Sequence, residues 1–325
     1  MKLATLRDGS RDGRLAVIRS DQRAFVDASG VAPNLQAALD DWGRAEPALR
    51  ALAEDLERGR AAGASLDVSR LMSPLPRAYE WIDGSAYLSH VLRVRRARGA
   101  PPPPALETEP LVYQGGSGVL LAPTDPLILG DAAWDLDFEG EIAVVLGDTP
   151  RGVGAGDAHR QVLLLALVND ISLRGLASRE LAKGFGFFLS KPRPAFAPFA
   201  VTPDELGAAW RNGRAHLSVR CTLNGQIVGD VEAGAEMHFS FFDLIAYITR
   251  TRRFVAGSIL GGGTVSNVDA RRGTACLVER RALETVEKGA PATSYMKPGD
   301  TLVIEAFDST GRSIFGRIEQ VVVEG

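Results

Sequence analysis

From residue 127 onward the sequence is dominated by short strand-like segments that do not alternate regularly with helices. The segments begin at residues 127, 137, 217, 275 and 301, and LNGQ around Gly225 and DSTG around Gly311 are strong turn signals. Helical patterns are fewer, chiefly GDAHRQVLLLALV from residue 156 and FFDLIAYITR from residue 241. A doubly wound sheet requires strands that alternate with helices. The sequence therefore predicts an α+β fold that is mainly β.

The first seventy residues have a different pattern, which predicts a small separate domain. Residues 1–30 contain short strands between Gly, Asp and Ser turns, and Asn34 precedes a stretch with leucines at helical spacing. Residues 66–76 lose this periodicity and contain Pro74 and Pro76, which is typical of a linker. We therefore expect a small N-terminal α+β domain over residues 1–70 and a larger domain over residues 71–325.

Charge and cysteine content exclude several classes of function. The 325 residues include 37 basic and 40 acidic side chains, so no basic field is available for nucleic acid or an anionic membrane. No stretch approaches about 18 consecutive apolar residues, and charges at Lys2, Arg7 and Asp8 precede any signal-peptide region, which predicts a cytoplasmic protein. Cys221 and Cys276 match no zinc or disulfide spacing and are expected to be small core residues.

One strand-like segment carries a ladder of acidic residues. In DLDFEGEIAVVLG the two-residue period of a strand places Asp137, Glu139 and Glu141 on one face and apolar residues on the other. Carboxylates this close repel one another unless water, a proton or a cation compensates their charge. Spacing alone favours a solvated face, because a site for Mg²⁺, Mn²⁺ or Ca²⁺ would need further carboxylates from elsewhere.

Three other residues could contribute to such a site. Asp170 follows the apolar run VLLLALVN, where a buried charge is costly unless it is paired, coordinated or solvated. Asp83 and His90 are seven residues apart, which on a helix would place them on nearly the same face. Taken alone, His90 is more typical of a structural or surface histidine.

The glycine-rich segments do not indicate a nucleotide-binding fold. None of the clusters near residues 115, 152 and 261 has the strand, GxGxxG and helix context of dinucleotide binding, so tight turns explain them better. GGGTVSN nevertheless exposes backbone amides beside the Thr264 hydroxyl, which could anchor a substrate carboxylate. Lys183 and Lys191 flank the aromatic stretch GFGFF, which indicates either simple packing or a lysine near a pocket.

In combination, six motifs resemble those of the fumarylacetoacetate hydrolase family: YEWIDGSAYLSH, DFEGEIAVVLG, LVNDISLRG, GFGFFLSKP, GGGTVSN and SIFGRIEQ. The resemblance runs from about residue 75 to the C-terminus, and the first seventy residues resemble the variable small domain of bacterial members. It implies a mixed β-roll, usually homodimeric, that binds a divalent metal, with Mg²⁺ favoured over Mn²⁺ or Ca²⁺.

The resemblance also implies roles for individual residues. Four carboxylates would bind the metal, which reverses the preference for a solvated strand face: Asp83, Glu139, Glu141 and Asp170. His90 would activate water and Glu279 would orient it, whereas the many family members without this histidine catalyse lyase, isomerase or decarboxylase reactions. The residues expected around the substrate are Arg174, Lys191, Tyr113, Gly263 and Thr264. Three pocket positions depart from the fumarylacetoacetase pattern, with Ser85, Ala177 and Leu181 in place of tyrosine, glutamine and tyrosine.

We therefore expect a metal-dependent hydrolase that cleaves a carbon–carbon bond in a small diketo acid of the fumarylacetoacetate or acylpyruvate type, with Lys191 stabilising the developing oxyanion. A hydratase, isomerase or decarboxylase of aromatic catabolism in the same family is the first alternative, because metal-assisted enolisation would suffice for it. A noncatalytic protein with a structural Ca²⁺ site on the same carboxylates is the second.

Overall fold

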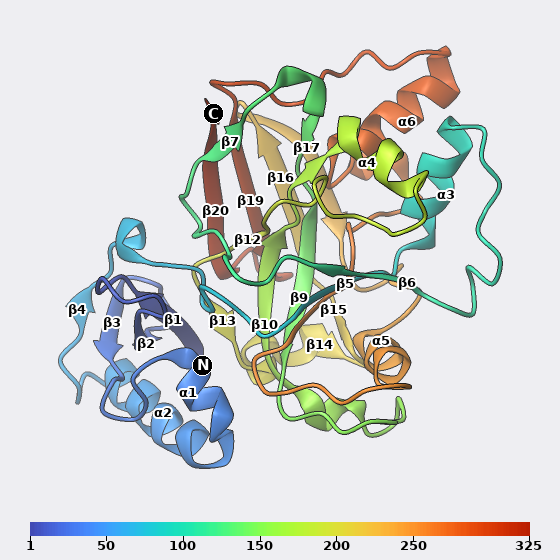
Figure 1. Ribbon diagram of the computed structural model, residues 1–325. Helices are drawn as coiled ribbons and strands as arrows, with labels where there is room; N and C mark the ends of the chain where they lie inside the picture. The colour runs from blue at the N-terminus through green and yellow to red at the C-terminus, as the bar shows by residue number, and fades with distance from the viewer.

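The computed structural model describes residues 1–325 and contains two large β-sheets that face each other across the main core (Figure 1). The first sheet has eleven strands, with β12 (Ala195–Phe196) pairing beside β10. Its other strands follow the order β4 (Ala64–Ser65), β3 (Ala24–Asp27), β2 (Arg14–Ile18), β1 (Lys2–Leu6), β13 (Ala200–Val201), β10 (Val162–Asn169), β9 (Gly140–Leu146), β18 (Ile259–Gly261), β5 (Trp81–Ser85) and β6 (Leu111–Gly115).

A second sheet has five strands, and two short ribbons complete the β-structure. The five strands follow the order β17 (Gln226–Glu232), β16 (Ser218–Leu223), β19 (Thr301–Phe307), β20 (Ser313–Glu324) and β7 (Leu127–Leu129). The ribbons pair β8 (Leu136–Asp137) with β11 (Ser172–Leu173) and β14 (Trp210–Arg211) with β15 (Arg214–Ala215). Strands thus dominate the chain, and the predicted α+β fold that is mainly β is confirmed.

The helices lie outside the sheets (Figure 1). They are α1 (Leu35–Asp40), α2 (Trp42–Glu57), α3 (Leu88–Ala97), α4 (Arg174–Leu181), α5 (Phe241–Ile248) and α6 (Leu277–Lys288). Five short 3₁₀ helices are η1 (Val68–Arg70), η2 (Ala132–Trp134), η3 (Ala158–Gln161), η4 (Pro203–Ala209) and η5 (Ala270–Arg272). No helix combines the length and apolar character that crossing a membrane would require.

The N-terminal residues form a small unit of β1–β4 with α1 and α2, shown in blue in Figure 1. The Asn34 side chain accepts a hydrogen bond from the Ala37 amide at 2.9 Å and so caps α1. Strand β1 pairs antiparallel with β13, with Lys2 opposite Val201. The sheet of the small unit is therefore continuous with the main sheet.

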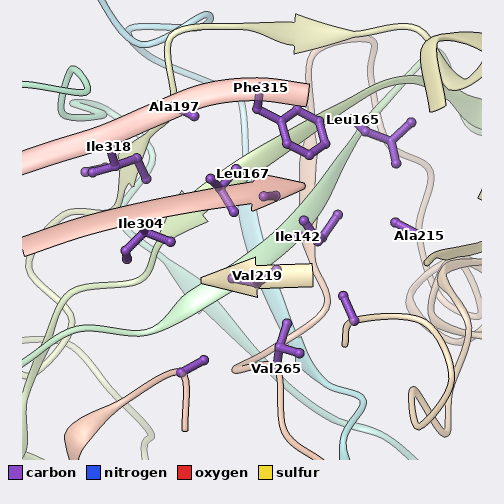
Figure 2. Packing of buried hydrophobic residues seen from close by; sticks show 14 of the residues in the cluster. Ile142, Leu165, Leu167, Ala197, Ala215, Val219, Val265, Ile304, Phe315 and Ile318 are labelled. Carbon is purple, nitrogen blue, oxygen red and sulfur yellow. The ribbon is translucent and has the colours of Figure 1, made fainter. Parts of the chain in front are cut away.

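The main core contains 52 buried residues between the two sheets. Figure 2 shows Ile142 of β9 and Leu167 of β10 close to Val219 of β16, with Ile304 of β19 in the same cluster. A second core of 23 residues covers the opposite face of the large sheet, where α1 and α2 of the small unit pack.

Strand β9 is buried on both faces, and its alternation sets the direction of the acidic ladder. Ile142 and Val144 belong to the main core, whereas Ala143 and Val145 belong to the second core. Because side chains alternate along a strand, Glu141 shares the face of Ala143 and Val145 and points away from the main core. Apolar residues thus anchor both faces of the strand, and Glu141 lies on the face that the second core covers.

Three local predictions are wrong. Residues 277–288 form helix α6 rather than a strand, and residues 162–169 form strand β10 rather than a helix. A continuous apolar run does not distinguish the two, and β10 is apolar on both faces because the main core covers one face and the second core covers the other. Asp83 and His90 do not share a helix, since Asp83 lies on β5 and His90 on α3.

Candidate metal and catalytic site

Three buried carboxylates from neighbouring strands meet at one end of the large sheet. Asp83 lies on β5, Glu141 on β9, and Asp170 directly after β10, and oxygen atoms of all three lie within 4.8 Å of one another. Strand β18 runs between β5 and β9, and its Gly261 pairs with Asp83. A Cβ on Gly261 would lie 2.3 Å from Asp83 Oδ1, so the missing side chain makes room for the cluster.

The three carboxylates have raised pKa values. Burial and the charge of Asp170 raise the pKa of Asp83. Burial and the charge of Asp83 raise the pKa of Glu141, and burial raises that of Asp170 although Lys191 opposes it. Both carboxylate oxygens of Glu141 are buried and have no hydrogen-bond partner. Burying such a group is costly unless a proton or a cation neutralises it.

Glu139, the fourth predicted ligand, is held by two cationic side chains. Lys191 Nζ donates to Glu139 Oε2 at 2.6 Å and to Asp170 Oδ2 at 2.5 Å. Arg174 donates to Glu139 Oε1 at 2.5 Å and to Asp137 Oδ2 at 2.9 Å. Burial raises the pKa of Glu139, but the charges of Lys191 and Arg174 outweigh it and lower the pKa below its ordinary value.

The donor set fits a divalent cation. Only two cationic side chains, Lys191 and Arg174, lie among the buried carboxylates of this site. The buried carboxylates number five: Asp83, Asp137, Glu139, Glu141 and Asp170. Excess negative charge in a buried place calls for a cation, and an all-oxygen donor set suits Mg²⁺, Mn²⁺ or Ca²⁺. The oxygen atoms of Asp83, Glu141 and Asp170 lie close to one another. Glu139 is connected to this group by Lys191, which donates to both Glu139 and Asp170.

His90 and Glu279 form a second cluster between helices α3 and α6. His90 Nδ1 lies 2.8 Å from Glu279 Oε2, and Glu279 is fully buried. Burial raises the pKa of Glu279, but the hydrogen bond and charge of His90, together with Arg93, lower it below the ordinary value. An ionised carboxylate accepts the proton of Nδ1–H, which leaves Nε2 of a neutral imidazole as an acceptor. The charge of His90 also lowers the pKa of Glu139, so the two clusters are close enough to interact.

Asp137 connects the acidic ladder to helix α6. Its carboxylate accepts hydrogen bonds from the Leu277 amide at 2.7 Å and the Val278 amide at 3.0 Å. These are the first two amides of the helix, where a negative charge is favourable. Glu279 is the next residue, so Asp137 fixes the end of the helix that carries it. Burial and the charge of Asp137 raise the pKa of the neighbouring Cys276 thiol, which keeps it protonated.

The other predicted substrate residues surround the carboxylates. Tyr113 Oη donates to Asp170 Oδ2 at 2.7 Å, and Lys191 Nζ lies 5.5 Å from the centre of the Tyr113 ring. The Gly263 amide donates to Asp83 Oδ1 at 3.1 Å, and Thr264 follows it in a buried turn.

Gly263 adopts a positive φ of +81° in this turn, and a Cβ there would lie 2.3 Å from the Gly84 carbonyl oxygen. The glycine therefore allows the turn to lie directly against strand β5.

Three residues of the site were not predicted individually. Asp137 belongs to the acidic ladder and Ser266 to GGGTVSN, so both lay within motifs that the sequence indicated. Ser266 Oγ donates to Glu279 Oε1 at 2.8 Å, and Arg93 NH1 donates to the same oxygen at 2.6 Å. Arg93 lies in the basic run VLRVRRARG, which gave no sign of a partner.

Comparison with known proteins finds related sequences and structures. Residues 80–323 match the family described as fumarylacetoacetate (FAA) hydrolase C-terminal, and residues 1–77 match fumarylacetoacetase N-terminal domain 2. Human mitochondrial oxaloacetate tautomerase FAHD2B is 27% identical over 167 residues, which cover 50% of this chain and 51% of that protein. Oxaloacetate tautomerase YisK of Bacillus subtilis is 27% identical over 206 residues, 63% of this chain and 64% of that protein.

The chain spans about half the length of the first of these curated relatives. Among solved structures, maleylpyruvate hydrolase from Sphingobium sp. SYK-6 in complex with manganese(II) ion and pyruvate superposes with a TM-score of 0.66 over 100% of both chains. At 19% identity this likeness shows a shared fold. The family match covers both parts of the sequence, and its larger part contains every residue of the two clusters. The chain therefore belongs to the fumarylacetoacetate hydrolase family.

Proposed function

We propose that the protein is a metal-dependent hydrolase that cleaves a carbon–carbon bond in a small diketo acid of the fumarylacetoacetate or acylpyruvate type. The observation that carries the proposal is the His90–Glu279 pair beside the carboxylate cluster. A site that only enolises a substrate has no need of a base that activates water. An imidazole held through Nδ1 by a buried carboxylate is the arrangement that general-base catalysis requires.

The metal would be held by Asp83, Glu139, Glu141 and Asp170, with Mg²⁺ the first choice and Mn²⁺ or Ca²⁺ the alternatives. When bound, a divalent cation supplies a Lewis acid for the carbonyl oxygens of a dicarbonyl substrate. The known manganese complex of the related maleylpyruvate hydrolase supports a metal of this class.

The side chains of this protein then have separate tasks. His90 Nε2 takes a proton from water, and the resulting hydroxide attacks one carbonyl carbon of the substrate. Lys191 uses two of its three N–H groups on Glu139 and Asp170, and its third N–H is left to donate to the oxyanion. The bond to the neighbouring carbon breaks, its electron pair becomes the enolate of the leaving fragment, and a proton from His90 completes a second carboxylic or keto acid.

A tautomerase is the second candidate, because two curated relatives are named oxaloacetate tautomerases. Keto–enol exchange needs proton transfer at carbon but no attack by water, so the carboxylate cluster and a bound cation would suffice. In that case the His90–Glu279 pair would not contribute to turnover.

Product analysis separates the candidates. The purified protein is incubated with a panel of acylpyruvates and with oxaloacetate, in Mg²⁺ or Mn²⁺ and in a chelator. The hydrolase proposal expects two acids from an acylpyruvate, in a metal-dependent reaction that His90→Ala abolishes and the exposed control Glu287→Gln does not. Enol–keto exchange of oxaloacetate without any cleavage, at the same rate in His90→Ala, would replace it with a tautomerase. No turnover of any substrate, with Ca²⁺ raising only the melting temperature, would leave a structural metal site.

A further inference from the structure

Arg93 is the most extensively bonded cation of the His90–Glu279 cluster. It lies one helical turn after His90 on α3, and its side chain is 16% exposed. NH1 donates to Glu279 Oε1 and to the Asn267 carbonyl oxygen, both at 2.6 Å. NH2 donates to the Val268 carbonyl oxygen at 2.7 Å. One guanidinium thus joins α3, α6 and the segment that follows the glycine-rich turn.

Both oxygens of the Glu279 carboxylate are occupied by this network. Oε2 faces His90, while Oε1 accepts from Arg93 and from the Ser266 hydroxyl at 2.8 Å. With one oxygen fixed by two donors, the other oxygen can point in only one direction, which is toward His90 Nδ1. The hydroxyl of Ser89 in turn donates to Ser266 Oγ at 2.8 Å, so the Ser266 hydrogen is directed to Glu279.

Charge balance gives Arg93 a second task. A fully buried carboxylate needs a nearby positive charge to remain ionised. Arg93 supplies one, and its hydrogen bond contributes to the lowered pKa of Glu279. Without Arg93, the only cation available to this carboxylate would be His90 itself, in its protonated form. A protonated imidazole cannot accept a proton from water, and a protonated Glu279 is a weaker acceptor that no longer selects the Nδ1–H tautomer.

We propose that Arg93 is a positioning residue that keeps Glu279 ionised and aimed, so that His90 stays neutral with its proton on Nδ1. This inference rests on the proposed function, in which His90 Nε2 activates water. Arg93 does not touch the carboxylate cluster, so its effect is confined to the base.

Arg96 offers a matched control on the same helix. It is an exposed arginine three residues after Arg93, and its side chain makes no hydrogen bond or ion pair. Arg96→Met therefore removes the same charge and nearly the same volume from α3 without touching Glu279. Arg93→Lys keeps the positive charge but replaces the planar fork with a single ammonium.

The test compares Arg93→Met, Arg93→Lys and Arg96→Met in the full chain. In Arg93→Met we expect kcat to fall by about 10-fold to 100-fold, the usual effect of losing a partner that orients a functional histidine, with KM and Mn²⁺ affinity close to wild type. Arg93→Lys recovers part of kcat, and Arg96→Met retains all of it. Equal losses in kcat and Mn²⁺ affinity would overturn the proposal, because they would show general damage to the site.

A second measurement separates this inference from the proposed function. The ¹⁵N chemical shifts of the His90 imidazole report its protonation and tautomer without any substrate. We expect the Nδ1–H form in wild type, Arg93→Lys and Arg96→Met, and its loss in Arg93→Met. Wild-type shifts in Arg93→Met refute the inference whatever the enzyme catalyses. If Arg93→Met does not fold, Arg93→Gln removes the charge while keeping an amide donor, and wild-type shifts in that variant refute the inference instead. Failure of the wild type to cleave any diketo acid would refute only the proposed function.

Discussion

Replacing Glu141 by glutamine should stabilise the metal-free protein and reduce the further stabilisation that metal provides. Both Glu141 oxygens are buried without a partner, and their burial beside Asp83 raises the pKa of the group. Glutamine has nearly the same shape and no charge, and its amide can donate to the neighbouring carboxylates. Relief of an unsatisfied buried group is worth about 1–3 kcal/mol, so the metal-free variant should be more stable than the metal-free wild type.

The stabilisation that metal provides should be much smaller in the variant than in wild type. A ligand present at about 100 times its dissociation constant stabilises a folded protein by about 2.7 kcal/mol. Loss of even an indirect partner of a metal site typically costs 10–100-fold in affinity, so loss of a direct ligand should cost at least about 100-fold. At the same metal concentration the variant would then gain only about 0.4 kcal/mol. For a chain of this size 1 kcal/mol shifts Tm by about 2 °C, which predicts a metal-induced shift of about 5 °C in wild type and about 1 °C in Glu141→Gln.

Differential scanning fluorimetry in a chelator measures the difference in Tm between the two metal-free proteins. The same assay with Mn²⁺ measures the metal-induced shift in Tm of each protein. Glu287→Gln is the control, since Glu287 lies exposed near the end of α6 and makes no side-chain hydrogen bond or ion pair. The variant should melt above wild type in chelator, and Mn²⁺ should raise its melting temperature by about 1 °C against about 5 °C for wild type. A variant that melts below wild type in chelator and still shows the full metal shift would refute a metal site at Glu141.

Three further predictions follow from the same geometry. His90→Ala should lower the rate of hydrolysis by about 100-fold to 10,000-fold while Mn²⁺ affinity measured by calorimetry stays unchanged, and Glu279→Gln should show a milder loss. Asp137→Ala should lower the free energy of unfolding by about 1–2 kcal/mol through loss of the cap of α6, with faster hydrogen exchange at the Leu277 amide; unchanged exchange there would contradict it. Metal-free protein should lose stability as pH rises above the ordinary carboxyl range, because the raised pKa values of the three converging carboxylates let the unfolded state release protons first. Denaturant titrations at several pH values, in which added Mn²⁺ removes the loss, measure this effect.

The sheet-rich fold could be predicted because strand alternation and turn residues are local signals. Asn224 and Gly225, for example, both adopt the positive φ that a tight hairpin turn needs, and both are recognisable in the sequence. Helix α6 could not be recognised in this way. Cys276 at its start makes no side-chain cap, and the group that satisfies the first amides is Asp137, which is 140 residues away in the chain. The beginning of this helix is therefore set by a tertiary contact, which the local sequence does not reveal.

In the candidate site, too, some features follow from the local sequence and others depend on tertiary contacts. The placement of Glu139 and Glu141 on one face follows from strand period, but the sequence cannot show that Glu139 meets two cations while Glu141 meets none. The approach of Asp83 and Asp170 depends on the strand order β5-β18-β9-β10. The resemblance to a family supplied these residues, whereas Arg93 appeared only through its contacts in three dimensions.

The two clusters of the site are carried by different kinds of secondary structure, which matters for directed evolution of this protein. Three carboxylates stand on or beside β-strands that are buried on both faces, so random substitution around them would cost stability. His90 and Glu279 stand on α3 and α6, which pack against each other outside the sheets. A variant library restricted to these two helices would therefore search for new reactions on an unaltered cluster of carboxylates, with the strands left as a fixed scaffold.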